Sequence, residues 1–319
     1  MYDVIIIGGG PAGLSAALLL GRCCRKVLVA DHGRPRNYAA RQMHGYLTRD
    51  GVKPSEILRL GRQELIAYQV DIRDEKVETV EAIPDRAQWD CVYRVIFEGG
   101  SSYETRKILL ATGVIDDLPD IEGSQQFYGL GVHHCPYCDG WEYRGKALVA
   151  FGVGEKALAL ALMLRHWSPN VTLCTQGEQI PDAARRRLLV HNITLRTEVV
   201  VKLEGAQEPE GRLERILFED GTKIPCDAFF FSTGQGQHAD LSHALGCKRD
   251  DQDQVCCDSW MHTELYGCFI AGDTGGREGA DVQFVIQAAA KGATAAVGIN
   301  RQLMQEDLDK REQEAGFQP

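Results

Sequence analysis

The chain carries one structural plan twice, and this repetition constrains its fold more than any other feature. Residues 2–30 read as an apolar strand, a glycine turn, a helix and a second apolar strand. Residues 147–174 repeat that order, and each copy later closes on a strand that enters Thr-Gly, at Thr112-Gly113 and at Thr233-Gly234. Strand, glycine turn and helix in this order are typical of nucleotide-binding α/β domains, so we predict an α/β chain with two such units.

Composition and charge narrow the class of protein. The chain has 319 residues, 44% hydrophobic and 25% charged, which suits a globular protein of about two domains. A net charge of −10 disfavours nucleic acid and anionic membranes as partners. The apolar stretch Leu14–Leu20 is too short to span ~30 Å of hydrocarbon, and no basic segment precedes Val4. We therefore expect a cytoplasmic location.

The first glycine turn is expected to bind a dinucleotide. In Gly8-x-Gly10-x-x-Gly13, the first glycine allows the tight turn, the second lets a pyrophosphate approach, and the third lets the helix pack closely. The pyrophosphate then meets the helix N-terminus, which favours negative charge. Asp31 closes the second strand, where a carboxylate can accept hydrogen bonds from ribose hydroxyls.

The glycine turn alone does not separate FAD from NAD. Gly272-Asp273 follows a late strand, a position that suits the ribityl and phosphate region of a long cofactor. A helix from about Gln283 to Leu303 presents its positive N-terminus near the expected flavin ring, which favours anionic reduced flavin. These features favour FAD. The tail beyond Gln305 is expected to fray.

The eleven cysteines divide into groups. Without an export signal, most should be reduced and buried; five fit this interpretation: Cys91, Cys174, Cys226, Cys247 and Cys268. The adjacent pairs Cys23-Cys24 and Cys256-Cys257 are not natural disulfides, because neighbouring side chains point apart.

Cys135-Pro136-Tyr137-Cys138-Asp139-Gly140 is the exception among the cysteines. One thiol can attack a substrate while the other resolves the mixed disulfide, and Asp139 could shuttle a proton. His133 or His134 could lower a thiol pKa or act as a base, although one of them could be structural. The alternatives are two inert thiols or a zinc half-site, which would need further ligands.

In their combination, these segments resemble the low-molecular-weight thioredoxin reductase family of flavoproteins. The matching motifs follow the family's order: Gly8–Gly13, Ala111-Thr112-Gly113, Cys135–Gly140, Gly152–Ala157 and Gly272-Asp273. The resemblance implies two Rossmann-like three-layer domains, with an FAD domain discontinuous in sequence (1–114 and 245–319) and a central domain at 115–244. It also implies a homodimer, with Cys138 facing the flavin, Cys135 facing the substrate and Asp139 as proton donor.

The chain departs from this family at two places. Family members that use NADPH carry arginines after the strand that ends here at Cys174, and these pair with the 2′-phosphate. Here the segment is Thr175-Gln176-Gly177-Glu178, so NADPH is not expected to be an efficient donor.

The second departure is the segment Gly33–Asn37, followed by His44-Gly45 and Asp50-Gly51. It is similar to relatives that oxidise dithiols on small natural products, and to cyanobacterial relatives that have lost NADPH. One such group, the diflavin-linked disulfide oxidoreductases, holds a second FAD in the degenerate pyridine-nucleotide pocket. A dinucleotide without a 2′-phosphate could likewise lie on Gly152–Ala157 here.

The expected site residues follow from these motifs, and no metal is expected. The expected catalytic residues are Cys135, Cys138, Asp139 and His134. The expected FAD contacts are Gly8, Gly10, Pro11, Ala12, Gly13, Asp31, His32, Arg36, Asn37, His44, Val77, Ala111, Thr112, Gly113, Gly272, Asp273, Gln283 and Phe284. The expected contacts of a second dinucleotide are Gly152, Gly154, Glu155 and Ala157.

We therefore expect an FAD-dependent disulfide oxidoreductase that passes electrons between FAD and Cys135/Cys138 without NADPH. The direction of electron flow, the thiol or disulfide substrate and the electron partner stay open. The alternatives are an NAD(P)H-dependent thioredoxin reductase, an oxygen-using dithiol oxidase of a small molecule, and a flavin-binding redox sensor without turnover.

Overall fold

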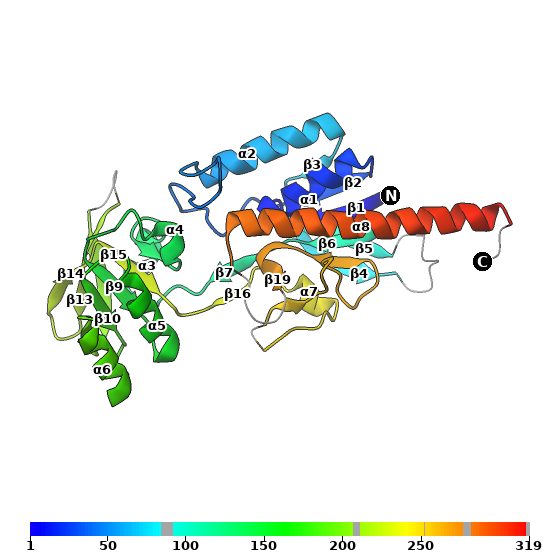
Figure 1. Cartoon of the computed structure of the whole chain (residues 1–319). Helices are drawn as coiled ribbons and strands as arrows, with labels where there is room; N and C mark the ends of the chain where they lie inside the picture. Colours follow the sequence, from blue (N-terminus) through cyan, green and yellow to red (C-terminus); the bar gives the residue numbers. More distant parts are fainter. Residues whose placement is uncertain (84–91, 207–210, 252, 277–281, 317–319) are drawn as a thin grey trace. The chain divides into compact units, whose positions relative to one another are not determined.

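The computed structural model describes residues 1–83, 92–206, 211–251, 253–276 and 282–316. This part of the chain divides into two compact units (Figure 1). The first unit combines Met1–Arg36, Ser55–Ile115 and Gly236–Pro319, and the second combines Asn37–Pro54 with Asp116–Gln235. The segment Asn37–Pro54 thus groups with the second unit, whereas the sequence alone places it with the first.

The first unit is built on one mixed sheet. Its strand order is β3-β2-β1-β6-β5-β4, and β18 also pairs with β6. The long strand β6 pairs in parallel with β1 and β18, and antiparallel with β5. The strands are β1 (Tyr2–Ile7), β2 (Val27–Ala30), β3 (Asp71–Arg73), β4 (Val77–Ala82), β5 (Tyr93–Phe97), β6 (Ser102–Leu110) and β18 (Cys268–Ile270).

Apolar residues cover both faces of this sheet. Because successive side chains of a strand point to opposite faces, Val4 and Ile6 of β1 enter one core cluster while Ile5 and Ile7 enter another. The first cluster lies against helices α1 (Pro11–Arg22) and α8 (Val285–Glu314). The remaining elements of the unit are α2 (Pro54–Leu65), η1 (Ile66–Tyr68), α7 (Leu241–Ala244), β17 (Val255–Cys256), η2 (Gly272–Thr274) and β19 (Gly275–Gly276).

The second unit repeats the plan of the first. Its parallel sheet has the order β11-β10-β9-β15-β8, and an antiparallel sheet has the order β12-β13-β14. The strands are β8 (Val132–His133), β9 (Leu148–Phe151), β10 (Val171–Cys174), β11 (Thr194–Arg196), β12 (Val200–Gly205), β13 (Leu213–Phe218), β14 (Lys223–Pro225) and β15 (Ala228–Phe231). The helices are α3 (Ser124–Phe127), α4 (Pro136–Asp139), α5 (Gly154–Leu164) and α6 (Asp182–Val190).

Apolar residues also cover both faces of the parallel sheet in the second unit. Leu148 and Ala150 of β9 pack with α5 and α6, whereas Val149 and Phe151 pack with the antiparallel sheet. The chain passes between the units through β7 (Val114–Asp116) and β16 (Gln235–Gln237), which pair with each other. The expectation of two Rossmann-like α/β units is therefore confirmed.

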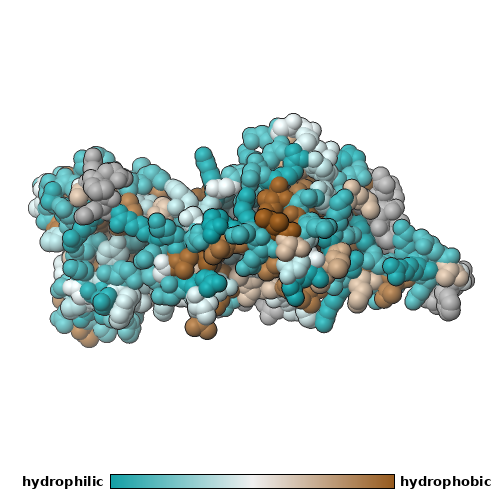
Figure 2. Space-filling model, turned by 90° about the horizontal axis from the view of Figure 1, so that it is seen from above, coloured by the Kyte–Doolittle hydropathy of each residue, from teal (hydrophilic) through white to brown (hydrophobic). Residues whose placement is uncertain are grey.

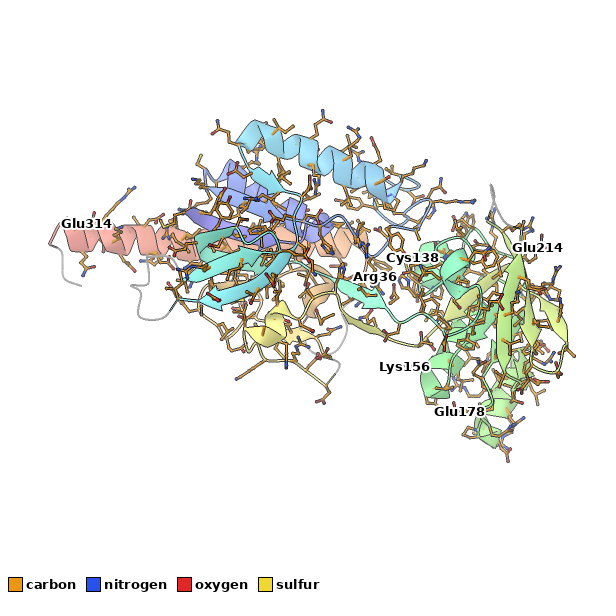
Figure 3. All side chains as sticks on the ribbon, turned by 180° about the vertical axis from the view of Figure 1, so that it is seen from behind. Arg36, Cys138, Lys156, Glu178, Glu214 and Glu314 are labelled. Atoms are coloured by element: carbon orange, nitrogen blue, oxygen red, sulfur yellow. A yellow bond between two sulfur atoms is a disulfide. The ribbon has the colours of Figure 1, made fainter. Side chains whose placement is uncertain are left out.

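The C-terminal helix differs from the expectation. Helix α8 begins at Val285 and continues to Glu314, so the predicted fraying beyond Gln305 is wrong (Figure 3 labels Glu314). Leu303 and Glu306 are buried, so the helix still packs on the unit past that point. Farther back along α8, a Cβ on Gly292 would overlap the backbone of Ala12, so glycine is required for α8 to pack closely on α1.

A buried ion pair joins the far part of α8 to the sheet. Lys107 of β6 bonds to Glu306 of α8, and their side chains are 0% and 4% exposed. Arg106 adds a second bond to the Glu306 carboxylate at 3.0 Å, and Tyr266 donates to it as well. Burial lowers the pKa of Lys107, so the carboxylate is needed to offset the cost of the buried charge.

The surface in Figure 2 is largely hydrophilic, with apolar residues confined to small areas. Within the described ranges, no helix combines the length and the apolar character that crossing a membrane requires.

Replacing Glu306 by alanine should destabilise the first unit. Without the carboxylate, Lys107 keeps a buried charge without its partner, which costs about 3–5 kcal/mol of unfolding free energy. Urea unfolding monitored by circular dichroism measures the change. Glu312→Ala, on the exposed end of the same helix, serves as control and should change stability by less than about 0.5 kcal/mol. Equal stability of the two variants would contradict the assignment of a buried ion pair.

Candidate functional site

The N-terminus of α1 is shaped to receive an anion. No side chain caps the helix at Gly10, and no acidic residue lies in its first turn, so its N–H groups and dipole favour negative charge. A Cβ built on Gly10 meets no atom within 4 Å, whereas one on Gly13 would overlap the carbonyl oxygen of Gly8. Gly10 therefore borders open space, and Gly13 allows the helix to approach the turn. These features fit a pyrophosphate.

A loop from the far end of the chain returns to this turn. The hydroxyl of Thr274 accepts the N–H of Gly113 at 2.7 Å. Lys291 of α8 donates to the carbonyl oxygens of Gly272 and Gly275, each at 3.1 Å. Ala12 in the first turn of α1 lies under Gly272, whose Cβ would come within 3.1 Å of the Ala12 Cβ. The structure thus brings the expected residues of the two segments together.

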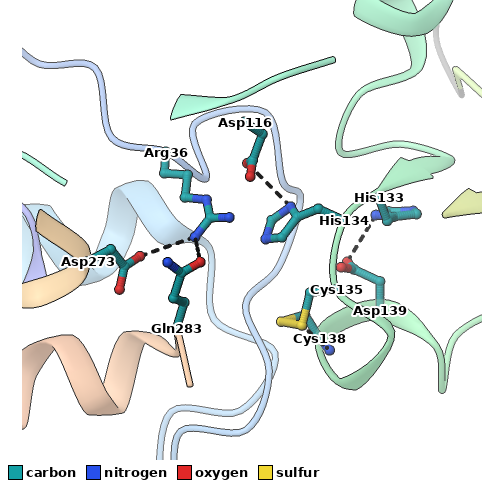
Figure 4. Close-up of a disulfide and its surroundings, with 9 residues drawn as sticks. All are labelled: Arg36, Asp116, His133, His134, Cys135, Cys138, Asp139, Asp273 and Gln283. Atoms are coloured by element: carbon teal, nitrogen blue, oxygen red, sulfur yellow. Dashed lines mark hydrogen bonds and ion pairs between the residues drawn. A yellow bond between two sulfur atoms is a disulfide. The ribbon is translucent and has the colours of Figure 1, made fainter. Parts of the chain in front are cut away.

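Arg36 links the loop to the start of α8. Its guanidinium lies 3.2 Å from the Asp273 carboxylate and 2.7 Å from the Gln283 amide oxygen (Figure 4). Phe284 is the N-cap of α8, and that helix end likewise lacks a side-chain cap. Three of the expected flavin contacts are therefore joined in one polar cluster.

Asp31, at the end of β2, is less exposed to a ligand than the sequence suggests. Arg62 of α2 donates to its carboxylate at 2.8 Å, and the N–H of Gly33 donates at 3.3 Å. The next residue, His32, lies with its ring 5.0 Å from the ring of His238, and burial lowers the pKa of His238. A ribose hydroxyl would therefore share the Asp31 carboxylate with Arg62.

The remaining expected FAD contacts fall in different places. Val77 is buried at the start of β4, and Ala111 is buried just after β6. Asn37 and His44 belong to the second unit, whereas the Gly8–Gly13 turn belongs to the first.

The second glycine turn differs from the first in its charge. Helix α5 also lacks a side-chain cap, and a Cβ on Gly154 would again meet no atom within 4 Å. Glu155, however, places a carboxylate in the first helical turn, where it opposes an incoming phosphate. Ala157 is buried, and Gly152 lies against Ser232. This turn can approach a ligand but is less suited to an anion.

Cys135 and Cys138 form a disulfide, with their Cα atoms 5.3 Å apart. Cys135 is the N-cap of the short helix α4, and its sulfur accepts the N–H of Cys138 at 3.2 Å. A hydrogen bond to sulfur favours the thiolate over the thiol. When the disulfide opens, this contact stabilises negative charge on Cys135.

A first histidine–carboxylate pair lies beside the disulfide. The Nδ1 of His133 lies 3.3 Å from the Asp139 carboxylate, and its Nε2 lies 3.3 Å from the Tyr143 hydroxyl (Figure 4 shows the pair). Burial, aided by the charge of Asp139, raises the pKa of Tyr143 to about 12, so its hydroxyl stays protonated and donates to the Leu130 carbonyl. His133 is 5% exposed, which suits an orienting role.

A second histidine–carboxylate pair lies directly before Cys135. The Nδ1 of His134 lies 3.4 Å from the carboxylate of Asp116, whose side chain is 3% exposed. The hydroxyl of Tyr128 donates to the same carboxylate oxygen at 2.6 Å. The His134 side chain is 31% exposed, so this histidine is the more accessible of the two.

The segment Asn37–Pro54 packs on the second unit near the end of the cysteine motif. His44 lies 3.4 Å from the Asp50 carboxylate and 3.6 Å from that of Glu142. Tyr38 accepts a hydrogen bond from Gln125 at 3.0 Å. The structure therefore places His44 beside the residues that follow Cys138.

The loop after β10 is fixed by its own side chains. The hydroxyl of Thr175 donates to the Glu178 carbonyl at 2.6 Å, and the Gln176 amide bonds both the N–H and the carbonyl of Val200. Two arginines lie near this loop. Arg196 bonds Glu198 and stacks on Phe218, and Arg185 donates to Gln179 at 2.8 Å.

Several other cysteines are free and buried, as the sequence predicts. Cys174, Cys226, Cys247 and Cys268 are free and buried, while Cys91 lies outside the described residues. Burial raises the pKa of Cys174 to about 12, and it raises that of Cys226 well above the ordinary range. The Cys174 and Cys226 thiols are therefore protonated and poor nucleophiles. A hydrogen bond with the Cys268 thiol instead lowers the pKa of Cys247.

A family model, that of the pyridine nucleotide-disulphide oxidoreductases, matches residues 2–295. The chain belongs to this family. Curated relatives of this chain are named thioredoxin reductase. One is the probable thioredoxin reductase of Arthroderma benhamiae, 30% identical over 96% of this chain and 81% of that protein. Another is the thioredoxin reductase sirT of Leptosphaeria maculans, 28% identical over 98% and 97%.

Solved structures superpose closely on this chain. The crystal structure of HlmI matches with a TM-score of 0.91 and 32% identity, covering 99% of this chain and 96% of that one. The putative thioredoxin reductase TrxB from Bacillus anthracis matches with a TM-score of 0.88 and 28% identity, covering 96% and 100%. The resemblance inferred from the motifs is confirmed, and this family member is an FAD-dependent oxidoreductase that acts on sulfur groups.

Sequence patterns missed several polar partners in this oxidoreductase. Lys291, Arg62, Asp116 and Glu142 each contact an expected site residue but belong to no motif. The available signal is weak, because each is a single charged residue far from its partner in sequence.

Replacing Gly10 by valine should abolish FAD binding and leave the fold intact. The Cβ of the new side chain meets no atom within 4 Å, and its methyl groups extend into the space at the α1 N-terminus. We expect the flavin content per chain to fall at least about tenfold, because a pyrophosphate would be displaced from the helix end. Absorbance at 450 nm of purified protein measures it, and circular dichroism should match that of wild-type apoprotein. Gly13→Val, by contrast, should also lower the folded yield, because its Cβ overlaps Gly8. Normal flavin content in Gly10→Val would contradict this assignment.

Proposed function

We propose that this oxidoreductase oxidises dithiols through Cys135/Cys138 and FAD and that it does not depend on NADPH. The observation that carries the proposal is the loop after β10. Its four residues, Thr175 to Glu178, include no cation and one exposed carboxylate, and hydrogen bonds hold the loop in place. A 2′-phosphate is dianionic and needs fixed positive charge, so binding it here would be unfavourable.

The surroundings of the disulfide support a thiol substrate. His134 is accessible and lies next to Cys135, so it is placed to take a proton from an incoming thiol. The substrate thiolate then attacks the sulfur of Cys135, and the bond to Cys138 breaks. A second substrate thiol attacks the mixed disulfide, which releases the oxidised substrate and a Cys135 thiolate that the Cys138 N–H stabilises.

Two electrons and two protons have then moved from the dithiol to the cysteine pair. FAD supplies the chemistry that accepts two electrons from a dithiol. Asp139, which follows Cys138 and lies 3.3 Å from His133, would handle the proton at the Cys138 sulfur. Gly8–Gly13, Asp273 and Gln283 would hold the flavin, and we expect the active form to be a homodimer.

A second candidate is a conventional thioredoxin reductase with altered nucleotide preference. The retained glycine turn at Gly152–Ala157 and the names of the relatives favour it. NADH lacks the 2′-phosphate, so the lack of a cation within Thr175–Glu178 would not exclude it.

Rapid mixing distinguishes the two candidates. Under anaerobic conditions, NADPH and NADH should each reduce the flavin more slowly than about 1 per second, whereas dithiothreitol should bleach it through the cysteine pair. In air, the same dithiol should release hydrogen peroxide. Cys138→Ser should lose the reaction with dithiol. Flavin reduction by NADPH at tens per second would refute NADPH independence, and strict inertness of the reduced flavin to oxygen would count against an oxidase.

The flavin content tests whether the central unit takes a second dinucleotide. Glu155 opposes phosphate at the α5 N-terminus, so we expect one FAD per chain after heat release. Absorbance of the released flavin against protein concentration gives the ratio. Two FAD molecules per chain would instead establish the diflavin arrangement.

A further inference from the structure

We propose that Asp116 is a positioning residue that orients His134 as the base beside Cys135. This inference rests on the proposed thiol chemistry and adds a residue that no motif of the chain contains. Asp116 ends β7, and His134 follows β8, so two separate segments of the second unit bring them together.

The buried position of the Asp116 carboxylate is unfavourable unless other groups compensate its charge. Its side chain is 3% exposed, and a buried carboxylate must be compensated by hydrogen bonds or opposite charge. Tyr128 supplies one hydrogen bond at 2.6 Å, and His134 lies 3.4 Å from the same oxygen. The carboxylate is thus held by Tyr128 and directed at the residue before Cys135.

The contact through Nδ1 decides what His134 can do. In a neutral imidazole one nitrogen carries the proton and the other has a lone pair. A group that accepts a hydrogen bond from one nitrogen favours the tautomer with the proton on that nitrogen. A carboxylate accepts hydrogen bonds, so Asp116 at 3.4 Å favours the proton on Nδ1 and the lone pair on Nε2, which then acts as the base. Figure 4 shows Asp116, His134 and the disulfide in succession.

His133 and His134 have different surroundings, so we assign them to different cysteines. Both ring nitrogens of His133 have partners, Asp139 and the Tyr143 hydroxyl, and its ring is buried. His133 therefore serves Asp139 on the Cys138 side. His134, directed by Asp116, serves Cys135 and the substrate thiol.

The disulfide accepts the two electrons of the dithiol, and its two sulfurs take up the two protons. His134 takes the proton of one substrate thiol at Nε2, and the thiolate forms a bond to the Cys135 sulfur. The Cys135–Cys138 bond breaks, and its electron pair leaves on Cys138. The second substrate thiol gives its proton to the Cys138 thiolate, and its sulfur attacks the substrate sulfur of the mixed disulfide. The substrate disulfide forms, Cys135 leaves as a thiolate, and the imidazolium returns its proton to it.

The test compares Asp116→Asn, His134→Gln and the double variant as FAD-loaded enzymes. Stopped-flow bleaching of the flavin by dithiothreitol at pH 7 should be about 10²–10⁴-fold slower in Asp116→Asn, because the amide favours the wrong tautomer. The limiting rate should fall while the half-saturating dithiol concentration stays unchanged. The double variant should be no slower than His134→Gln, because the two residues act as one unit. Multiplied effects would overturn the proposal.

The pH dependence separates positioning from a general loss of structure. Above about pH 9 the dithiol is largely a thiolate and needs no base. The deficit of Asp116→Asn should therefore shrink as pH rises, whereas a structural defect would leave it constant. Asp117→Asn, the exposed neighbour, is the matched control and should react like wild type. Tyr128→Phe keeps the carboxylate and should slow the reaction less than about fivefold.

A second readout covers the case in which wild type does not react with dithiol, which would contradict the proposed function. The pair is reduced with a phosphine, the phosphine is removed, and iodoacetamide labelling of Cys135 is followed by mass spectrometry. Labelling at pH 7 should slow equally in Asp116→Asn and His134→Gln. Labelling of Asp116→Asn at the wild-type rate would overturn the role of Asp116 independently of turnover.

Discussion

The first unit depends on how closely its helices can approach the glycine turn. Gly13 lets α1 lie against the carbonyl of Gly8, and Gly292 lets α8 lie against the backbone of Ala12. Because α8 can come this near, Lys291 reaches the carbonyls of Gly272 and Gly275 and fixes the loop that carries Asp273. The N-terminus of α1 begins at a glycine, so it has no side-chain cap and is open at Gly10. Small residues therefore decide both the fold and the place for a dinucleotide.

The second unit uses the same plan for different chemistry. Its glycine turn is also uncapped, but Glu155 and the cation-free loop after β10 weaken its attraction for phosphate. Beside the disulfide, each of two neighbouring histidines has its own carboxylate, Asp139 or Asp116. Two copies of one architecture have thus separated into a unit that favours an anion and a unit that favours thiol exchange.

The repeat, the glycine turns and the disulfide could be predicted because each depends on residues adjacent in sequence. Asp116 and Lys291 could not, because their partners are brought near only by folding. The segment Asn37–Pro54 was misplaced for a related reason, since sequence order says nothing about which unit a polar loop packs on. The length of α8 was underestimated because its last turns are charged, yet Glu306 is buried against Lys107 rather than exposed.

The discontinuous path of the chain sets an order for its synthesis. The strands of the parallel sheet in the second unit all lie between Val132 and Phe231, so this sheet can be complete while the ribosome is still adding residues. Synthesis of the first unit begins earlier, but its sheet and core are complete only after β18 and α8 have been made. Until they emerge, α1 alone covers only part of one face of β1 and β6, and Lys107 lacks the Glu306 carboxylate. A nascent chain that stalls in this interval exposes apolar strands, which makes it a candidate for chaperone capture or degradation.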